Sequence, residues 1–251
     1  MVVGGEDAVN GGNCLPDLVT PVDAAELGAC FYRVWLEDLR GSAPNREAII
    51  ILLAHWAVET GRGSKCHRFN VGNAKASVGG PYDYTFFACG EELSLATAER
   101  EAAKDPRVVI LRKYVYGGRS LASCHIMPKH PWSCFRAFDD LLSGAADHLS
   151  LIHRRYPDAF LAALANHPQG YAVELKRRGY YTASVEQYSA ALVGSVPWAK
   201  KQLDRSDWSS LPGLSSWEIE RVNGVVALSA QLTEDDWQAM RRERDEAVGA
   251  G

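Results

Sequence analysis

The chain has 251 residues, and its 27 Lys and Arg against 31 Asp and Glu give a formal net charge of −4. Hydrophobic residues make up 47% and charged residues 23%, which is typical of globular proteins and excludes collagen-like or disordered chains. The acidic balance disfavours a nucleic-acid binder. The longest apolar run, 48–54, is too short to cross a bilayer. We therefore expect a globular protein with no nucleic-acid partner and no membrane span.

The first thirteen residues are slightly acidic and contain no basic, apolar stretch, so they do not resemble a secretory signal. We therefore expect the chain to be made in the cytoplasm, where thiols are reduced, and its six cysteines to be mainly free buried thiols. The alternative is a zinc site, although the spacing fits no tight finger pattern. Its ligands would be Cys124, His125, His130 and Cys134. No metal or organic cofactor is expected.

Helical periodicity predicts a first helix over 21–40, capped by Thr20, and a second helix that begins after Asn45. The second helix is apolar almost all round, so it should be buried. It should end near Glu59, because Gly61 follows closely. These two helices open the main domain.

The middle of the chain, about 64–132, is rich in Gly, Asn, Tyr and Thr and predicts a small irregular β lobe. Strands are expected around 82–87 and over 108–116, with a short helix over 94–104 between them. Further helices are then expected, the last of them capped by Ser184 and ended by Pro197. They cover 137–156, 158–166, 170–178 and 185–193.

The expected organisation is an N-terminal arm, 1–20, a main domain, 21–198, and a C-terminal appendage, 199–251. The appendage should contain a charged final helix over 233–246. It is the candidate surface for a protein partner. The fold class is mainly α, of the α+β type, with a helical lobe and a small β lobe.

Glu59 is the first candidate for chemistry. It follows the apolar run of the second helix and lies three residues after Trp56, on the same helical face. An apolar surround and the partial negative charge of a helix C-terminus both favour the protonated carboxyl group. A carboxylic acid that stays protonated near neutral pH is what a general acid requires. The alternative is a solvated glutamate at a helix end.

Four segments, in order, resemble the bacterial glucosaminidase family. They are LLAHWAVETGRG (52–63), FNVGNAKA (69–76), CFRAFDDLLSGAADHLSLIHRRYPDAF (134–160) and LKRRGYYTASVEQYSAAL (175–192). That family is similar in fold to lysozyme and the lytic transglycosylases, so the resemblance implies a lysozyme-like fold. The chain departs from the usual Glu-Ser-Gly-Trp-Gly pattern at Thr60 and Arg62.

The resemblance implies a peptidoglycan hydrolase that cleaves the β-1,4 bond between N-acetylglucosamine and N-acetylmuramic acid, with Glu59 as the acid. The alternatives are a muramidase or lytic transglycosylase on the same fold, or a non-catalytic glycan-binding or structural module. The chain would act on the glycan strand of the wall after release or delivery, as a phage lysin or an effector does.

The second carboxylate has more than one candidate. The family often has a Glu in a Thr-x-Glu-Tyr-like strand, and the closest match here is Asp83 in PYDY. Glu91 and Glu92 compete with it, provided that a tight turn forms at Gly90. Glu91 is preferred over Asp83, and the substrate's own acetamido group can replace either.

Aromatic rings are expected to stack on sugar faces. Tyr180 and Tyr181 occupy the family's Tyr segment, so one of them should stand near the acid, and the other, with Tyr188, should pack. Tyr181 is counted with the catalytic residues and Tyr180 with the substrate-binding ones. Trp132, at the end of the β lobe, is a candidate sugar platform.

Polar positions complete the candidate site. Asn70 and Asn73 match polar positions after the catalytic helix and are candidate substrate-binding residues, or they cap a turn. His55 lies four residues before Glu59, hence on the same face. For His55 we expect a buried, hydrogen-bonded imidazole with no catalytic role.

Overall fold

The computed structural model describes residues 11–39 and 44–205. The chain divides into two compact units, each described here by itself. Unit 1 comprises Met1–Leu18 and Asn73–Asp139, and unit 2 comprises Val19–Gly72 and Asp140–Gly251. The final helix expected over 233–246, most of the expected appendage and the first half of the N-terminal arm lie outside the described residues. No helix in the described ranges combines the length and apolarity needed to cross a membrane.

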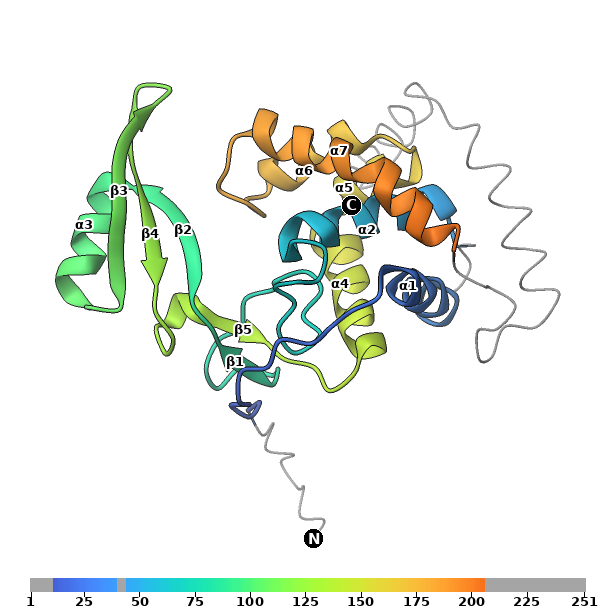
Figure 1. Cartoon of the computed structure of the whole chain (residues 1–251), viewed down its shortest axis with the longest axis horizontal. Helices are drawn as coiled ribbons and strands as arrows, with labels where there is room; N and C mark the ends of the chain where they lie inside the picture. Colours follow the sequence, from blue (N-terminus) through green and yellow to red (C-terminus); the bar gives the residue numbers. More distant parts are fainter. Residues whose placement is uncertain (1–10, 40–43, 206–251) are drawn as a thin grey trace, which may run out of the picture. The chain divides into compact units, whose positions relative to one another are not determined.

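The named secondary-structure elements in the described part of unit 2 are all helices. Its helices are α1 (Ala24–Asp38), α2 (Arg46–Thr60), α4 (Leu141–Arg155), α5 (Pro157–Leu164), α6 (Pro168–Arg177) and α7 (Val185–Leu203). Helix α2 packs against α1, α5 and α7, and α1 packs against α4 (Figure 1). The mainly helical α+β composition predicted from the sequence is confirmed.

Helix α2 forms the centre of the core of unit 2. Every residue from Ala48 to Ala57 is buried, and each buried Ile or Leu contributes about 2 kcal/mol to stability. The Asn45 side chain accepts a hydrogen bond from the backbone N–H of Ala48 at 2.9 Å and caps the helix. Gly61 ends it in the left-handed conformation, with φ 57°. The predicted bounds and burial of this helix are confirmed.

Helix α1 begins later than the sequence indicated. Asp23, not Thr20, caps it, because the Asp23 carboxylate accepts hydrogen bonds from the backbone N–H groups of Ala25 and Glu26. The Thr20 hydroxyl instead donates to the carbonyl oxygen of Cys66 at 3.2 Å. The prediction of Thr20 as the cap was wrong, since its hydroxyl binds a segment distant in sequence.

Helix α7 is longer than predicted. It passes through Pro197 and ends at Leu203, beyond the boundary expected at 198. A proline inside a helix removes one hydrogen bond and costs about 3 kcal/mol. Ala199 and Leu203 are fully buried on the far side of Pro197, so core packing offsets that cost. The prediction that Pro197 ends the helix was wrong.

Unit 1 combines two small sheets with one helix. Its elements are β1 (Tyr84–Phe86), β2 (Cys89–Ser94), α3 (Leu95–Lys104), β3 (Val108–Tyr116), β4 (Arg119–Ile126), the short 3-10 helix η1 (Pro131–Ser133) and β5 (Cys134–Arg136). Strands β2, β4 and β3 lie in that order in one antiparallel sheet, which α3 contacts, and β1 pairs with β5 in the other (Figure 1).

Strand β3 has the bounds that were predicted, and α3 begins one residue after the predicted start, with Ser94 as its cap. Strand β4 was not predicted, and it pairs with β3 across the turn at Gly117 and Gly118, both with positive φ. The tight turn at Gly90, on which the candidacy of Glu91 and Glu92 was conditional, does not form, because Gly90 lies inside β2 and pairs with His125.

Candidate active site

Glu59 lies in the last turn of α2 and is the centre of the candidate site. Its side chain is 19% exposed, so it is mostly covered by the protein but still reaches solvent. The Tyr188 hydroxyl, from α7, donates a hydrogen bond to Glu59 Oε1 at 2.6 Å. Since α2 and α7 pack together, the contact fixes the carboxyl group at the junction of the two helices.

Tyr188 is a residue of the candidate site that sequence reasoning missed, because we expected it to pack. Burial, with a further contribution from the Glu59 carboxylate, holds the pKa of Tyr188 well above its ordinary value. Its hydroxyl therefore stays a hydrogen-bond donor over the whole useful pH range. The signal was present in the sequence, since Tyr188 is the last tyrosine of the family-like segment LKRRGYYTASVEQY.

Tyr180 and Tyr181 surround this hydrogen bond but do not make it. The Tyr181 ring stacks on that of Tyr188 at 3.7 Å with an interplanar angle of 6°, and its hydroxyl donates to the carbonyl oxygen of Ala172. The Tyr180 hydroxyl donates to the carbonyl oxygen of Gly72 at 2.8 Å. Both tyrosines thus order the surroundings of Tyr188 and of the segment that follows α2.

His55 lies one turn before Glu59 and is fully buried, as predicted. Its Nδ1 lies 2.6 Å from the hydroxyl of Tyr171, a residue of α6. Its Nε2 lies 3.6 Å from Glu59 Oε1, which is too long for a hydrogen bond. The Tyr180 ring packs edge-on against the imidazole at 4.8 Å. The rings of His55, Tyr171 and Tyr180 therefore form an aromatic cluster on the protein side of the carboxyl group.

The segment after α2 is tightly held. Arg68 and Phe69 have φ of 49° and 51°, a conformation that side-chain-bearing residues adopt at a cost. The Phe69 backbone N–H donates to the Thr20 hydroxyl at 2.9 Å. Asn70, a predicted substrate-binding residue in unit 2, is buried, with 1% of its surface exposed.

The three candidates for the second carboxylate belong to unit 1, and each is engaged there. Asp83 Oδ1 accepts a hydrogen bond from the backbone N–H of Asn13 at 2.6 Å. Glu91 Oε1 lies 2.8 Å from the Lys75 ammonium group. Its competitor Glu92 accepts a hydrogen bond from the Tyr114 hydroxyl. Of the three, Glu91 is the one paired with a full positive charge.

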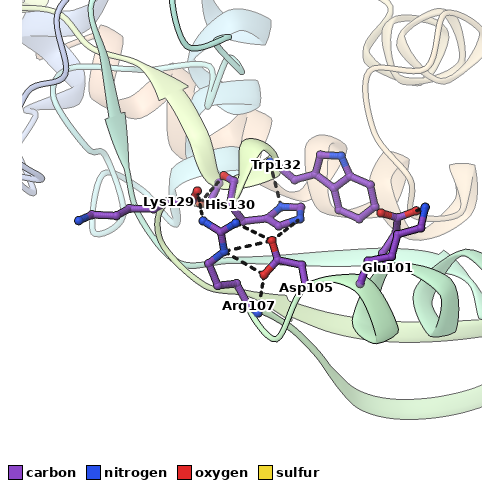
Figure 2. A network of polar contacts seen from close by, with 8 residues as sticks. Glu101, Asp105, Arg107, Lys129, His130 and Trp132 are labelled. Carbon is purple, nitrogen blue, oxygen red and sulfur yellow. Dashed lines mark hydrogen bonds and ion pairs between the residues drawn. The ribbon is translucent and has the colours of Figure 1, made fainter.

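Asn73 and Trp132, the other predicted substrate-binding residues, also belong to unit 1. Asn73 is half-buried with φ 47°. The Trp132 backbone N–H donates to His130 Nδ1 at 3.1 Å, and the two rings meet edge to face at 5.1 Å. Figure 2 shows the Trp132 indole extending beyond His130. The position of Trp132 is therefore set by its imidazole neighbour.

A polar network anchors that imidazole. Figure 2 shows Asp105 between Arg107 and His130, with Arg107 Nε 2.9 Å from Asp105 Oδ1 and His130 Nε2 3.9 Å from Oδ2. The Arg107 hydrogen bonds lower the pKa of Asp105 to about 2. This network joins the start of β3 to the segment between β4 and β5.

The six cysteines are free. Cys66, Cys124 and Cys134 are buried, as predicted, whereas Cys14 is exposed. Burial raises the pKa of the Cys66 thiol to about 11, so that thiol is unreactive near neutral pH. In the described part of the chain, no group of three or more His, Cys, Asp or Glu residues is arranged to hold a metal ion.

Comparison with known proteins gives one distant match. No family model matches the chain, and no curated protein matches it. Among solved structures, that of a peptidoglycan hydrolase mutant from Sphingomonas sp. A1 aligns with 72% of this chain and 95% of its own length. The TM-score is 0.43 and the sequence identity 18%. A match this distant defines neither family nor activity, which must be inferred from the residues themselves.

Proposed function

We propose that the chain is a peptidoglycan hydrolase that cleaves the β-1,4 bond between N-acetylglucosamine and N-acetylmuramic acid. The observation that carries the proposal is Glu59, at the end of the buried helix α2, with its side chain partly exposed and its carboxyl group hydrogen-bonded by Tyr188. The four family-like segments support the same assignment, because Glu59 takes the position of the family's acid. The substrate lies outside the cytoplasmic membrane, so the proposal includes release or delivery to the wall.

In the proposed reaction, the Glu59 carboxyl group gives its proton to the glycosidic oxygen as the bond to the sugar carbon breaks. The transition state is oxocarbenium-like, so positive charge develops at that carbon. Glu59 becomes a carboxylate in the same step, and the Tyr188 hydroxyl is already placed to donate to it. A donor placed in advance stabilises the charge without reorganisation. Water then attacks the sugar carbon and returns a proton to Glu59.

For the developing positive charge, we propose Asp83 in preference to Glu91, which reverses the order inferred from the sequence. The Lys75 ammonium group at 2.8 Å compensates the charge of Glu91, and this weakens its attraction for a distant cation. Among the described residues, the Asp83 carboxylate accepts hydrogen bonds from the neutral amide groups of Asn13. We expect Asp83→Asn to lower the cleavage rate more than Glu91→Gln. Equal rates for the two variants would instead favour the substrate's acetamido group.

The proposed function is tested by incubating the wild type and Glu59→Gln with purified peptidoglycan and identifying the new chain ends by mass spectrometry. We expect reducing N-acetylglucosamine ends from the wild type and at least a thousandfold slower release by the variant, about 4 kcal/mol in the barrier. Glu47→Gln, in the first turn of the same helix, is the matched control and should behave like the wild type.

Other products would redefine the reaction. Reducing muramic ends would indicate a muramidase, and anhydro-muramic ends a lytic transglycosylase, with Glu59 still the acid. Equal release by the wild type and Glu59→Gln would remove Glu59 from the mechanism. No release from walls of several species would contradict the hydrolase itself.

A further inference from the structure

We infer that His55 is a positioning residue for Glu59, and that its Nε2–H becomes a second hydrogen-bond donor to the Glu59 carboxylate once the acid has given up its proton. The inference rests on the proposed function, because it assigns a role within the same acid step. It differs from the sequence-based expectation, which gave His55 no part in the chemistry.

The first step of the argument is the position of the imidazole proton. The Tyr171 hydroxyl lies 2.6 Å from His55 Nδ1, and both side chains are fully buried. Burial, followed by the Glu59 carboxylate, holds the pKa of Tyr171 well above its ordinary value, so its hydroxyl keeps its proton. A buried hydroxyl proton needs an acceptor, and Nδ1 is the acceptor that the described residues offer it. In a neutral imidazole, the ring proton is then on Nε2.

The second step is the direction in which that proton points. Nε2 makes no hydrogen bond among the described residues, and Glu59 Oε1 lies 3.6 Å away. A buried N–H without an acceptor is unfavourable, and catalytic hydrogen bonds often shorten only in the substrate complex. A movement of about half an ångström would bring the two atoms within hydrogen-bond distance. The negative charge that Glu59 acquires during proton transfer supplies the attraction.

The third step concerns the groups around the imidazole. Tyr171 faces it from α6 and Tyr188 from α7, with Tyr180 between those helices and His148 on α4. Glu59 is the carboxylate facing the ring, and Asp147 lies near Tyr180. The three tyrosines have pKa values held well above the ordinary value, mainly by burial. The Tyr171 hydroxyl and the rings of Tyr180 and Tyr188 hold the imidazole in place, and these neutral phenols do not compete for the Glu59 proton.

The proton balance of the step is simple. The Glu59 proton passes to the glycosidic oxygen, His55 transfers none, and the attacking water returns a proton to Glu59. His55 therefore acts through Glu59 only, and it should affect how readily the acid ionises. Its removal should move the alkaline limb of the pH–rate profile to higher pH, because the ionised acid loses one of its donors.

The inferred contact has a test that does not depend on activity. Nitrogen-15 NMR of the imidazole side chains in the full chain distinguishes the two neutral tautomers. We expect the Nε2–H tautomer for His55 in the wild type, and a mixture in Tyr171→Phe, which lacks the hydroxyl that fills Nδ1. An Nδ1–H tautomer or a charged imidazolium in the wild type would overturn the inference.

The role in the reaction is tested with two variants of one site. The amide nitrogen of His55→Gln takes the place of Nε2, so its rate and pH profile should stay near those of the wild type. The amide of His55→Asn reaches only the Nδ1 position, so its rate should fall about tenfold, with the alkaline limb at higher pH. His148→Asn, a buried histidine at 5.0 Å from His55, is the control for packing and should keep the wild-type pH profile.

The outcomes separate the two proposals. If the wild type is active and Glu59→Gln is not, a wild-type rate and pH profile for His55→Asn overturns the positioning role. Equal losses in His55→Gln, His55→Asn and His148→Asn also overturn it, because they indicate packing. If the wild type releases no fragments, the proposed function fails and the positioning role fails with it, whereas the tautomer measurement still decides the contact.

Discussion

At the scale of single residues, the candidate acid differs from an ordinary surface glutamate in the hydroxyl that faces it. The Tyr188 hydroxyl donates to Glu59 Oε1, and burial keeps that phenol neutral by raising its pKa well above the ordinary value. A neutral donor stabilises the carboxylate that forms after proton transfer and carries no charge that would repel an oxocarbenium ion. The hydroxyl thus stabilises the transition state better than a lysine ammonium group would, because the lysine charge would repel the oxocarbenium ion.

Tyr188→Phe should therefore lower the cleavage rate more than it lowers stability. A hydrogen bond to a charged group is worth about 1.5–3 kcal/mol, so we expect a ten- to hundredfold slower release of fragments. The free energy of unfolding should change by less than about 1.5 kcal/mol, because Glu59 remains partly exposed to water. Tyr32→Phe, in α1, is the control and should release fragments at the wild-type rate. Equal rates for the two variants would contradict the role of Tyr188.

The position of Glu59 at the end of α2 was predictable from the sequence and its hydrogen bond with Tyr188 was not, for a physical reason. The position of Glu59 follows from local features, an apolar run ended by glycine. The hydrogen bond of Tyr188 joins residues 129 positions apart, and it depends on how α7 packs on α2. Local spacing says nothing about that packing, although the family-like segment contained the tyrosine.

At the scale of elements, helix α4 is positioned by a glycine at its contact with the segment after α2. A Cβ atom on Gly144 would lie 2.0 Å from the backbone carbonyl oxygen of Phe69, so only glycine permits this approach. Phe69 is itself held in the left-handed region and bound to Thr20. The close contact thus joins α4 to the segment that follows the candidate acid.

Gly144→Ala should destabilise the protein, although alanine is the better helix former. We expect the free energy of unfolding to fall by about 1–3 kcal/mol, as in other overpacked sites. Gly194→Ala is the matched control, because a Cβ at this exposed glycine of α7 meets no atom within 4 Å. It should raise the free energy of unfolding by up to about 1 kcal/mol. Urea unfolding of both variants measures the difference, and stabilisation by both would contradict the close contact.

The elements that were predicted well are those whose signals are local. Helix α2 has a capping asparagine and a terminal glycine, and β3 has a continuous β-branched and aromatic run. Strands β2 and β4 were missed, because β4 is mixed in polarity and β2 contains two glutamates. Strand β4 pairs with both β2 and β3, and these pairings stabilise the extended backbone that the β propensity of their own residues does not favour. The prediction at Pro197 failed for the same reason, because the burial of Ala199 and Leu203 outweighs the local cost of a proline inside α7.

At the scale of the whole molecule, the larger part of unit 1, Asn73–Asp139, is an insertion within the sequence of unit 2. The core of unit 2 combines helices from before the insertion, α1 and α2, with helices from after it, α4 to α7. The candidate acid and its tyrosine come from opposite sides of the insertion. The stability of unit 2 therefore bears directly on the geometry of the site, and one buried histidine makes that stability depend on pH.

That histidine is His148 of α4, whose imidazole is fully buried beside Phe31 and His55. Neither of its ring nitrogens has a hydrogen-bond partner among the described residues. Burial, with a smaller contribution from His55, lowers the pKa of His148 well below its ordinary value of 6.5. Between the lowered pKa and about 6.5, the unfolded chain binds a proton at this position and the folded chain does not. The free energy of unfolding must then fall as the pH drops through this range.

His148→Leu should remove this dependence. Above pH 6.5 the imidazole is neutral in both states, so the variant should be at least as stable as the wild type, since it buries no unpaired nitrogen. Below that pH, the stability of the wild type should fall relative to the variant by up to about 1.4 kcal/mol per pH unit. Urea unfolding at pH 7.5 and pH 5.0 measures the two differences. If they are equal, His148 takes up a proton as readily in the folded chain as in the unfolded one, and the helices around it do not keep water from its ring.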